Sequence, residues 1–161
     1  MSASQVPAGT SAPADTATAT DTAGTPLAVG TVIAEREVHL TRDSLVRYAG
    51  ASGDFNPIHY RDDVARSVGL PGVLAHGMLT MGLAVQPVAD WLGADGFVSE
   101  YGVRFTRPVV VDPEHGATVS VSAKVGTVRD DGVPERIDLT VKAADQTVLG
   151  KAQVTVRFRT A

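Results

Sequence analysis

The sequence predicts an α+β fold in which an antiparallel sheet wraps around one long buried helix. Three features indicate this fold: a run at 31–40 that alternates apolar and polar residues, a long apolar segment at 76–92, and four strand-like runs between 97 and 158. Alternation is typical of a strand with one buried face, whereas a helix that is apolar on every side needs other elements around it.

The early part of the predicted domain contains one strand and two short helices. Residues 31–40 (TVIAEREVHL) alternate roughly as a half-buried strand does. Thr41 is typical of a helix N-cap, and the Gly-Ala-Ser-Gly run at 50–53 should end the helix that follows it. A second short helix is expected at 61–68, ended by Gly69.

The segment 76–92 (HGMLTMGLAVQPVADWL) carries apolar residues on nearly every side of a helix. We therefore expect this helix to be buried all round. Pro87 lacks an amide donor, so it should kink the helix or end its first part.

Four strands rich in valine and threonine are expected after this helix, separated by turn residues. Their ranges are 97–109, 117–128, 135–143 and 148–158. Clear alternation in the second and fourth runs favours an antiparallel sheet with one solvent-facing side. One strand, one buried helix and four antiparallel strands form the arrangement called a hot-dog fold.

The composition excludes several classes of function. The 161 residues suit one domain, and a formal net charge of -4 offers no basic surface for nucleic acid. The absence of cysteine excludes disulfides, a thiolate nucleophile and cysteine-ligated metals. The longest apolar stretch, 77–88, is shorter than the ~20 residues that span a bilayer. We therefore expect a cytoplasmic protein that binds neither nucleic acid nor membrane.

Residues 1–26 differ from the rest of the chain. They are almost entirely Ala, Thr, Ser, Pro and Gly, without the basic and apolar regions of a signal peptide. Such a segment buries too little apolar surface to offset its ordering entropy. We expect a disordered tail at 1–26 and a single domain at 27–161.

Polar residues gather in the loop after the first helix. Asp54, Asn56 and His59 are spaced i, i+2, i+5, and a proline between them restricts the backbone. A carboxylate and an imidazole can remove the C2 proton of a 3-hydroxyacyl thioester and protonate its departing hydroxyl, while an amide holds water. The same residues could instead form an Asx-turn between two helices. A calcium loop does not fit, because Ile58 occupies the next ligand position.

His76 and Gly77 stand at the start of the long helix, where free amides and the helix dipole can stabilise an anion. The Gly77 amide could hydrogen-bond a thioester oxygen as an enolate forms. The alternative is that Gly77 serves close packing only and that His76 is a polar cap.

Four further residues carry weaker signals. Arg104 and Arg107 could contact the phosphates of coenzyme A or of a phosphopantetheine carrier, or they could be solvated surface residues. His39 and His115 are expected to be structural or exposed. No histidine pair has the spacing of a helical metal site, so no metal is predicted.

Two motifs in register resemble the MaoC-like (R)-specific hydratase/dehydratase family. The run Tyr48-Ala-Gly-Ala-Ser-Gly-Asp-Phe-Asn-Pro-Ile-His59 is similar to the family signature, and Ala75-His-Gly-Met-Leu-Thr80 is similar to the start of its central helix. The resemblance covers about residues 30–158. Within the family, residues 43–50, 75–82 and 100–106 resemble the B subunit of the mycobacterial two-subunit (3R)-hydroxyacyl-ACP dehydratase.

The resemblance implies a hydro-lyase that interconverts (3R)-3-hydroxyacyl and trans-2-enoyl thioesters. Asp54 and His59 would be its catalytic pair. Asn56 would hold the reacting water, and the Gly77 amide would polarise the thioester carbonyl. No cofactor is implied beyond the coenzyme A or acyl carrier protein that carries the substrate. The chain would form a homodimer, or a heterodimer with a related hot-dog subunit; the alternatives are a hot-dog thioesterase and a non-catalytic partner subunit.

Overall fold

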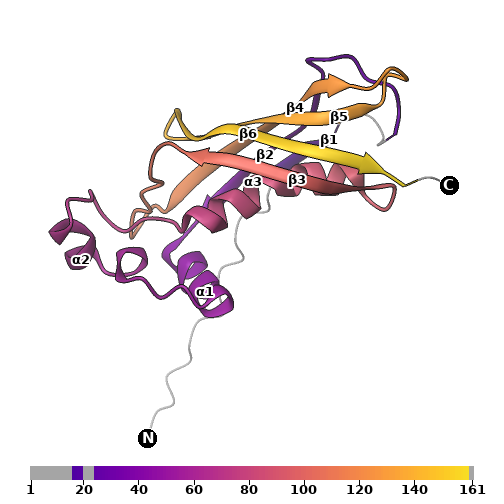
Figure 1. The fold of residues 1–161 in the computed structure, drawn as a ribbon. Helices are drawn as coiled ribbons and strands as arrows, with labels where there is room; N and C mark the ends of the chain where they lie inside the picture. Colours follow the sequence, from indigo (N-terminus) through magenta and orange to yellow (C-terminus); the bar gives the residue numbers. More distant parts are fainter. Residues whose placement is uncertain (1–15, 20–23, 160–161) are drawn as a thin grey trace, which may run out of the picture.

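The computed structural model describes residues 16–19 and 24–159. Its strands form one six-stranded antiparallel sheet (Figure 1). The strands lie in the order β1-β2-β4-β5-β6-β3, and each neighbouring pair is antiparallel. Their bounds are β1 Thr16–Ala19, β2 Val32–Leu40, β3 Gly96–Phe105, β4 Ala117–Val128, β5 Pro134–Ala143 and β6 Gln146–Phe158. The predicted antiparallel sheet is confirmed.

Helix α3 (Gly77–Leu92) packs on one face of this sheet, and the core forms between them (Figure 1). Its buried residues include Ala84, Val88 and Leu92, which recur at every fourth position. The expectation of a helix buried all round is wrong for the single chain, since the side chain of Met78 is 59% exposed. The physical reason is that the sheet covers only one side of the helix. Pro87 does not end α3, which continues to Leu92.

A helical segment between β2 and α3 lies beyond one end of the sheet (Figure 1). It consists of α1 (Arg42–Ser52), the 3₁₀ helix η1 (Pro57–His59) and α2 (Asp62–Ser67). The predicted cap is confirmed, because the Thr41 hydroxyl accepts a hydrogen bond from the Ser44 amide at 3.3 Å. Gly53 ends α1 with a φ of 76°, in the left-handed region that glycine adopts readily. No helix in the described part of the chain has the length and apolar character needed to cross a bilayer.

Strand β3 ends four residues earlier than predicted, at Phe105 instead of residue 109. Pro108 cannot donate to a strand ladder, and the chain leaves the sheet before it. Residues 109–111 pair instead with 73–75: the Ala75 amide donates to the Val109 carbonyl at 2.8 Å, and the next bond in register, from the amide of residue 111, measures 2.9 Å. This pairing brings the connection after β3 beside the helical segment.

The N-terminal tail also departs from the prediction in part. Within the segment expected to be disordered, Thr16–Ala19 forms β1, antiparallel to the outer edge of β2. Strand pairing uses backbone hydrogen bonds, so it does not need the apolar side chains that this segment lacks. Residues 1–15 and 20–23 lie outside the described residues, and the prediction for them stays a prediction.

Candidate active site

The polar loop predicted from the sequence lies between α1 and η1. One carboxylate oxygen of Asp54 accepts a hydrogen bond from the Asn56 amide at 3.2 Å. The Asn56 side-chain oxygen accepts one from the Ile58 amide, also at 3.2 Å, at the start of η1. These are Asx-turn contacts, so the structural interpretation of the loop is confirmed. The turn leaves the second carboxylate oxygen of Asp54 near His59, which makes the two interpretations compatible.

His59 is held in one orientation by a backbone carbonyl. The residue closes η1, is 9% exposed, and places its Nδ1 2.8 Å from the Leu74 carbonyl oxygen. A carbonyl only accepts hydrogen bonds, so Nδ1 carries the proton and the Nε2 lone pair of the neutral ring is free. Nε2 lies 3.9 Å from a carboxylate oxygen of Asp54. The structure therefore brings together the two residues that the sequence singled out.

His76 belongs to the same cluster, which the sequence did not predict. It is the N-cap residue of α3 but makes no side-chain cap hydrogen bond, so it caps the helix by its position and not through its ring. Its side chain is 1% exposed and stacks on His59, with ring centroids 3.8 Å apart. Its Nε2 lies 3.1 Å from the backbone carbonyl of Asp54, while its buried Nδ1 has no partner among the described residues. Burial lowers the pKa of His76 below its ordinary value, which favours the neutral ring.

Gly77 is the first residue of α3, so its amide is one of the four that have no partner within the helix. A Cβ at this position would lie 3.1 Å from the ring of Phe105. The close-packing interpretation of Gly77 therefore holds. The Gly77 amide, at the start of the helix, also lies beside a cavity that Gly77 and His59 both line.

This cavity has a volume of about 350 Å³ and lies between η1, the first turn of α3 and the ends of β3 and β6. Its wall is largely apolar and includes Leu74, Thr80, Phe105, Val148 and Leu149. Arg107 also lines the cavity and donates a hydrogen bond to the Thr147 carbonyl at 3.2 Å. Arg104 is exposed on β3 and does not line the cavity. A smaller apolar cavity of about 210 Å³ lies between His59 and α1, lined by Leu45, Val46, Ala49, Phe55 and Tyr60.

Asp54, His59 and His76 could also be considered as metal ligands, because one ligand atom of each lies within 4.8 Å of the others. Two imidazoles bind one ion when their in-plane lone pairs converge on it. Here the rings are stacked 3.8 Å apart with planes 23° apart, so lone pairs in the two planes do not converge on one point, and His76 Nε2 already contacts a carbonyl. The geometry favours proton transfer over metal binding. His39 and His115 are exposed, as predicted.

Comparisons with known proteins place the chain in a family. The family model of the MaoC like domain matches residues 26–146. The 3-hydroxyacyl-thioester dehydratase X of Mycobacterium tuberculosis is 35% identical over 83 residues, which cover 52% of this chain and 29% of that protein. The chain therefore spans less than a third of the length of this relative.

Solved structures have the same fold. A MaoC-like dehydratase superposes with a TM-score of 0.76 at 36% identity, over 86% of this chain and 44% of the other. A chain of the ChsH1-ChsH2 complex from Mycobacterium tuberculosis superposes with a TM-score of 0.70 at 24% identity, over 82% of this chain and 98% of the other. The hot-dog fold predicted from the sequence is confirmed, as is the resemblance carried by its two motifs. The chain belongs to the family of MaoC-like domains.

Proposed function

We propose that the protein is a hydro-lyase that interconverts (3R)-3-hydroxyacyl and trans-2-enoyl thioesters. The observation that carries the proposal is the position of His59: its free Nε2 lies 3.9 Å from the Asp54 carboxylate, at the wall of a cavity that Gly77 also lines. Dehydration of a 3-hydroxyacyl thioester needs a base, an acid and a hydrogen-bond donor for the developing oxyanion, all close to C2, C3 and the thioester carbonyl. The similarity to a protein described as a 3-hydroxyacyl-thioester dehydratase supports the same reaction.

In the dehydration direction, one member of the Asp54–His59 pair removes a proton from C2 of the 3-hydroxyacyl thioester. Negative charge develops on the thioester oxygen, where the Gly77 amide donates a hydrogen bond worth ~2.7–4 kcal/mol in comparable sites. As the C2–C3 double bond forms, the C3–O bond breaks, and the other member of the pair protonates the leaving hydroxyl to give water. The NH₂ group of Asn56 can donate a hydrogen bond to that water, because the side-chain oxygen of Asn56 already accepts one from the Ile58 backbone amide.

The geometry favours this reaction over the two alternatives. Thioesterases of this fold usually work with a lone carboxylate, whereas the Asp54 carboxylate here faces an imidazole whose tautomer is fixed. A non-catalytic subunit has no need of such a pair. The thioesterase alternative predicts release of a free thiol, which distinguishes it in an assay.

The substrate is proposed to be carried on coenzyme A or acyl carrier protein, without a further cofactor. Arg107 is better placed than Arg104 to contact the carrier phosphates, because only Arg107 lines the cavity. A cavity of about 350 Å³ lies within the size range of small-molecule sites, ~300–1,000 Å³, and its apolar wall suits an acyl chain. We propose that the reaction takes place in the cytoplasm.

We further propose that the chain works with a second hot-dog subunit, either its own copy or a related one. Within the described residues, edge strand β3 pairs only with β6, and an open edge is a site for strand pairing. In α3, Met78 is exposed and Met81 is half-buried. The structurally similar chain of the ChsH1-ChsH2 complex is itself part of a two-subunit assembly. A protein that is fully active as a monomer would contradict this part of the proposal.

The experiment that tests the proposed reaction follows the absorbance of the enoyl thioester of crotonyl-CoA with purified protein. Replacing Asp54 by Asn or His59 by Ala should each lower turnover by about 10²–10⁴-fold, because each removes a proton-transferring group. Asp63→Asn is the matched control, since Asp63 is exposed and paired with Arg61 on the same segment. Full turnover in either site variant would contradict the assignment.

A further inference from the structure

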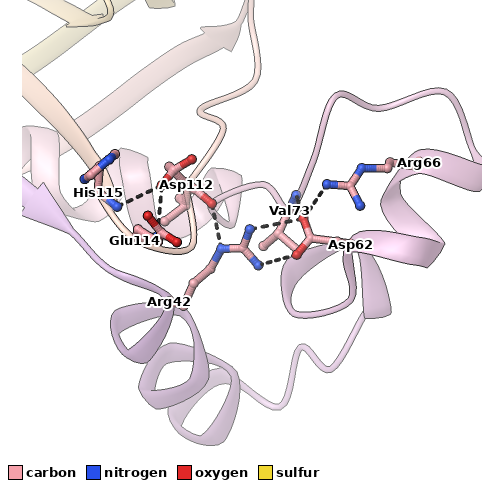
Figure 2. Close-up of polar contacts among 8 residues, drawn as sticks. Arg42, Asp62, Arg66, Val73, Asp112, Glu114 and His115 are labelled. Carbon is pink, nitrogen blue, oxygen red and sulfur yellow. Dashed lines mark hydrogen bonds and ion pairs between the residues drawn. The ribbon is translucent and has the colours of Figure 1, made fainter.

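Arg42 joins three parts of the chain that are distant in sequence (Figure 2). Its Nε donates to the Val111 carbonyl at 2.6 Å. Its two terminal nitrogens donate to the two carboxylate oxygens of Asp62, each at 3.1 Å. Two parallel hydrogen bonds to one carboxylate, with a third donor left for a carbonyl, are a geometry that a guanidinium provides and an ammonium does not.

The Arg42–Asp62 pair closes the segment that carries the catalytic loop. Arg42 is the first residue of α1 and Asp62 is the first residue of α2, so α1, the loop and η1 all lie between them. Both side chains are partly buried, at 22% and 32% exposure. We call this pair the clamp. It ties the two ends of a segment that lies beyond the sheet and so cannot be fixed by the strand ladder (Figure 1).

A short series of hydrogen bonds leads from the clamp to His59. A carboxylate oxygen of Asp62 also accepts from the Val73 amide at 3.3 Å, and the Val73 carbonyl accepts from the Val111 amide at 2.9 Å. The next residue, Leu74, donates its amide to η1 at 3.1 Å and accepts the Nδ1 proton of His59 at 2.8 Å. The carbonyl that fixes the His59 tautomer is thus one residue away from the contact with Asp62.

The segment around Val111, whose carbonyl accepts the hydrogen bond from Arg42 Nε, is itself held in place. The Val111 carbonyl precedes a turn in which the Asp112 carboxylate accepts from the Glu114 amide at 2.9 Å and the His115 amide at 2.8 Å (Figure 2). On the other side, Arg66 lies 3.8 Å from the Asp62 carboxylate. The hydrogen bonds from Arg42 hold the pKa of Asp62 below its ordinary value, so its carboxylate stays ionised at neutral pH.

We propose that Arg42 and Asp62 are positioning residues for the Asp54–His59 pair. Neither residue lines the cavity, so the clamp acts through the Leu74 carbonyl and not on the substrate. This inference rests on the proposed hydro-lyase function for its kinetic consequence. Its structural consequence, the fixed Nδ1 proton of His59, can be measured without turnover.

The test compares Arg42→Lys and Asp62→Asn with the control Arg36→Lys. Arg36 pairs with Asp90 at 2.6 Å and joins β2 to the last turns of α3, at the end of that helix far from Gly77. For each protein, kcat and KM for crotonyl-CoA and the thermal midpoint are measured. The His59 Nδ1 proton is observed by NMR in protein labelled with ¹⁵N-histidine.

In both clamp variants, kcat should fall by about tenfold or more, towards the ~10²-fold loss that a displacement of about 1 Å can cause. KM should change little, and the His59 Nδ1 proton should exchange faster with water. Arg36→Lys should leave both readouts unchanged even if it lowers the thermal midpoint. If Asp62→Asn does not fold, Arg42→Lys decides, because it keeps the charge.

Unchanged kcat and proton exchange in folded clamp variants would overturn the inference, and so would an equal loss in Arg36→Lys. If the wild-type protein has no turnover, alone or with a partner, the proposed function fails. The NMR readout would still decide whether the clamp positions His59.

Discussion

The imidazole of His76 lies almost flat against that of His59, with ring centroids 3.8 Å apart and planes 23° apart. Its Nε2 also contacts the backbone carbonyl of Asp54, so one buried side chain touches both Asp54 and His59. Burial favours the neutral form of His76, so in the proposed reaction this ring adds no positive charge beside the Asp54–His59 pair.

Two substitutions of His76 separate these contacts. His76→Phe keeps a stacked ring but loses the hydrogen bond, whereas His76→Gln keeps a donor but loses the stack. Each should lower kcat by up to about tenfold, or ~1.4 kcal/mol, through the lost hydrogen bond in His76→Phe and the lost stack in His76→Gln. The thermal midpoint of the phenylalanine variant should change little. Steady-state kinetics with crotonyl-CoA provide the measurement. Wild-type kcat in both variants would show that His76 does not support the pair.

The lowered pKa of His76 also predicts a pH dependence of stability. The unfolded chain binds a proton near the ordinary pKa of 6.5, whereas the folded chain binds it only at lower pH. The contribution of His76 is therefore complete above about pH 6.5 and is lost as the pH falls towards the folded pKa. The thermal midpoint should fall between pH 7 and about pH 5.5, and His76→Gln should flatten this slope. His39→Gln, at an exposed position, is the control; an equal slope in all three proteins would contradict the prediction.

Gly77→Ala should impair the site although it keeps the amide. The new Cβ would lie 3.1 Å from the Phe105 ring, which must move within the cavity that it lines. We expect kcat/KM to fall by about tenfold, a cost of ~1.4 kcal/mol within the range for a crowded packed site. Gly82→Ala is the matched control on the same helix, because a Cβ there would meet no atom within 4 Å outside its own stretch of helix. Activity in Gly77→Ala equal to that of Gly82→Ala would contradict this account.

The sequence predicted the elements that depend on local rules. The α1 cap at Thr41, the end of α1 in the 50–53 run and the alternation of the strands each follow from a few neighbouring residues. The candidate site loop could be singled out for the same reason, since Asp54, Asn56 and His59 lie within six positions. The error at β3 has a local cause as well: Pro108 indicates the break, but the apolar residues after it resemble a continued strand.

The features that the sequence did not predict depend on contacts between distant residues. His76 reaches Asp54 across 22 positions and Arg42 reaches Asp62 across 20, and the partners lie in different elements, so no repeat within one helix or strand relates them. The expected all-round burial of α3 was wrong because an apolar pattern does not say which surface covers it. For the exposed side near Met78, we propose a second subunit.

The product that the protein makes from crotonyl-CoA decides whether it is a hydro-lyase. Loss of the enoyl band, release of free thiol and the configuration of the product are measured in one reaction, with Asp54→Asn in parallel. We expect loss of the band, no thiol, and (3R)-3-hydroxybutyryl-CoA as the product of the wild-type protein, with turnover strongly reduced in the variant. Release of free coenzyme A, a (3S) product or undiminished turnover in Asp54→Asn would contradict the proposed function.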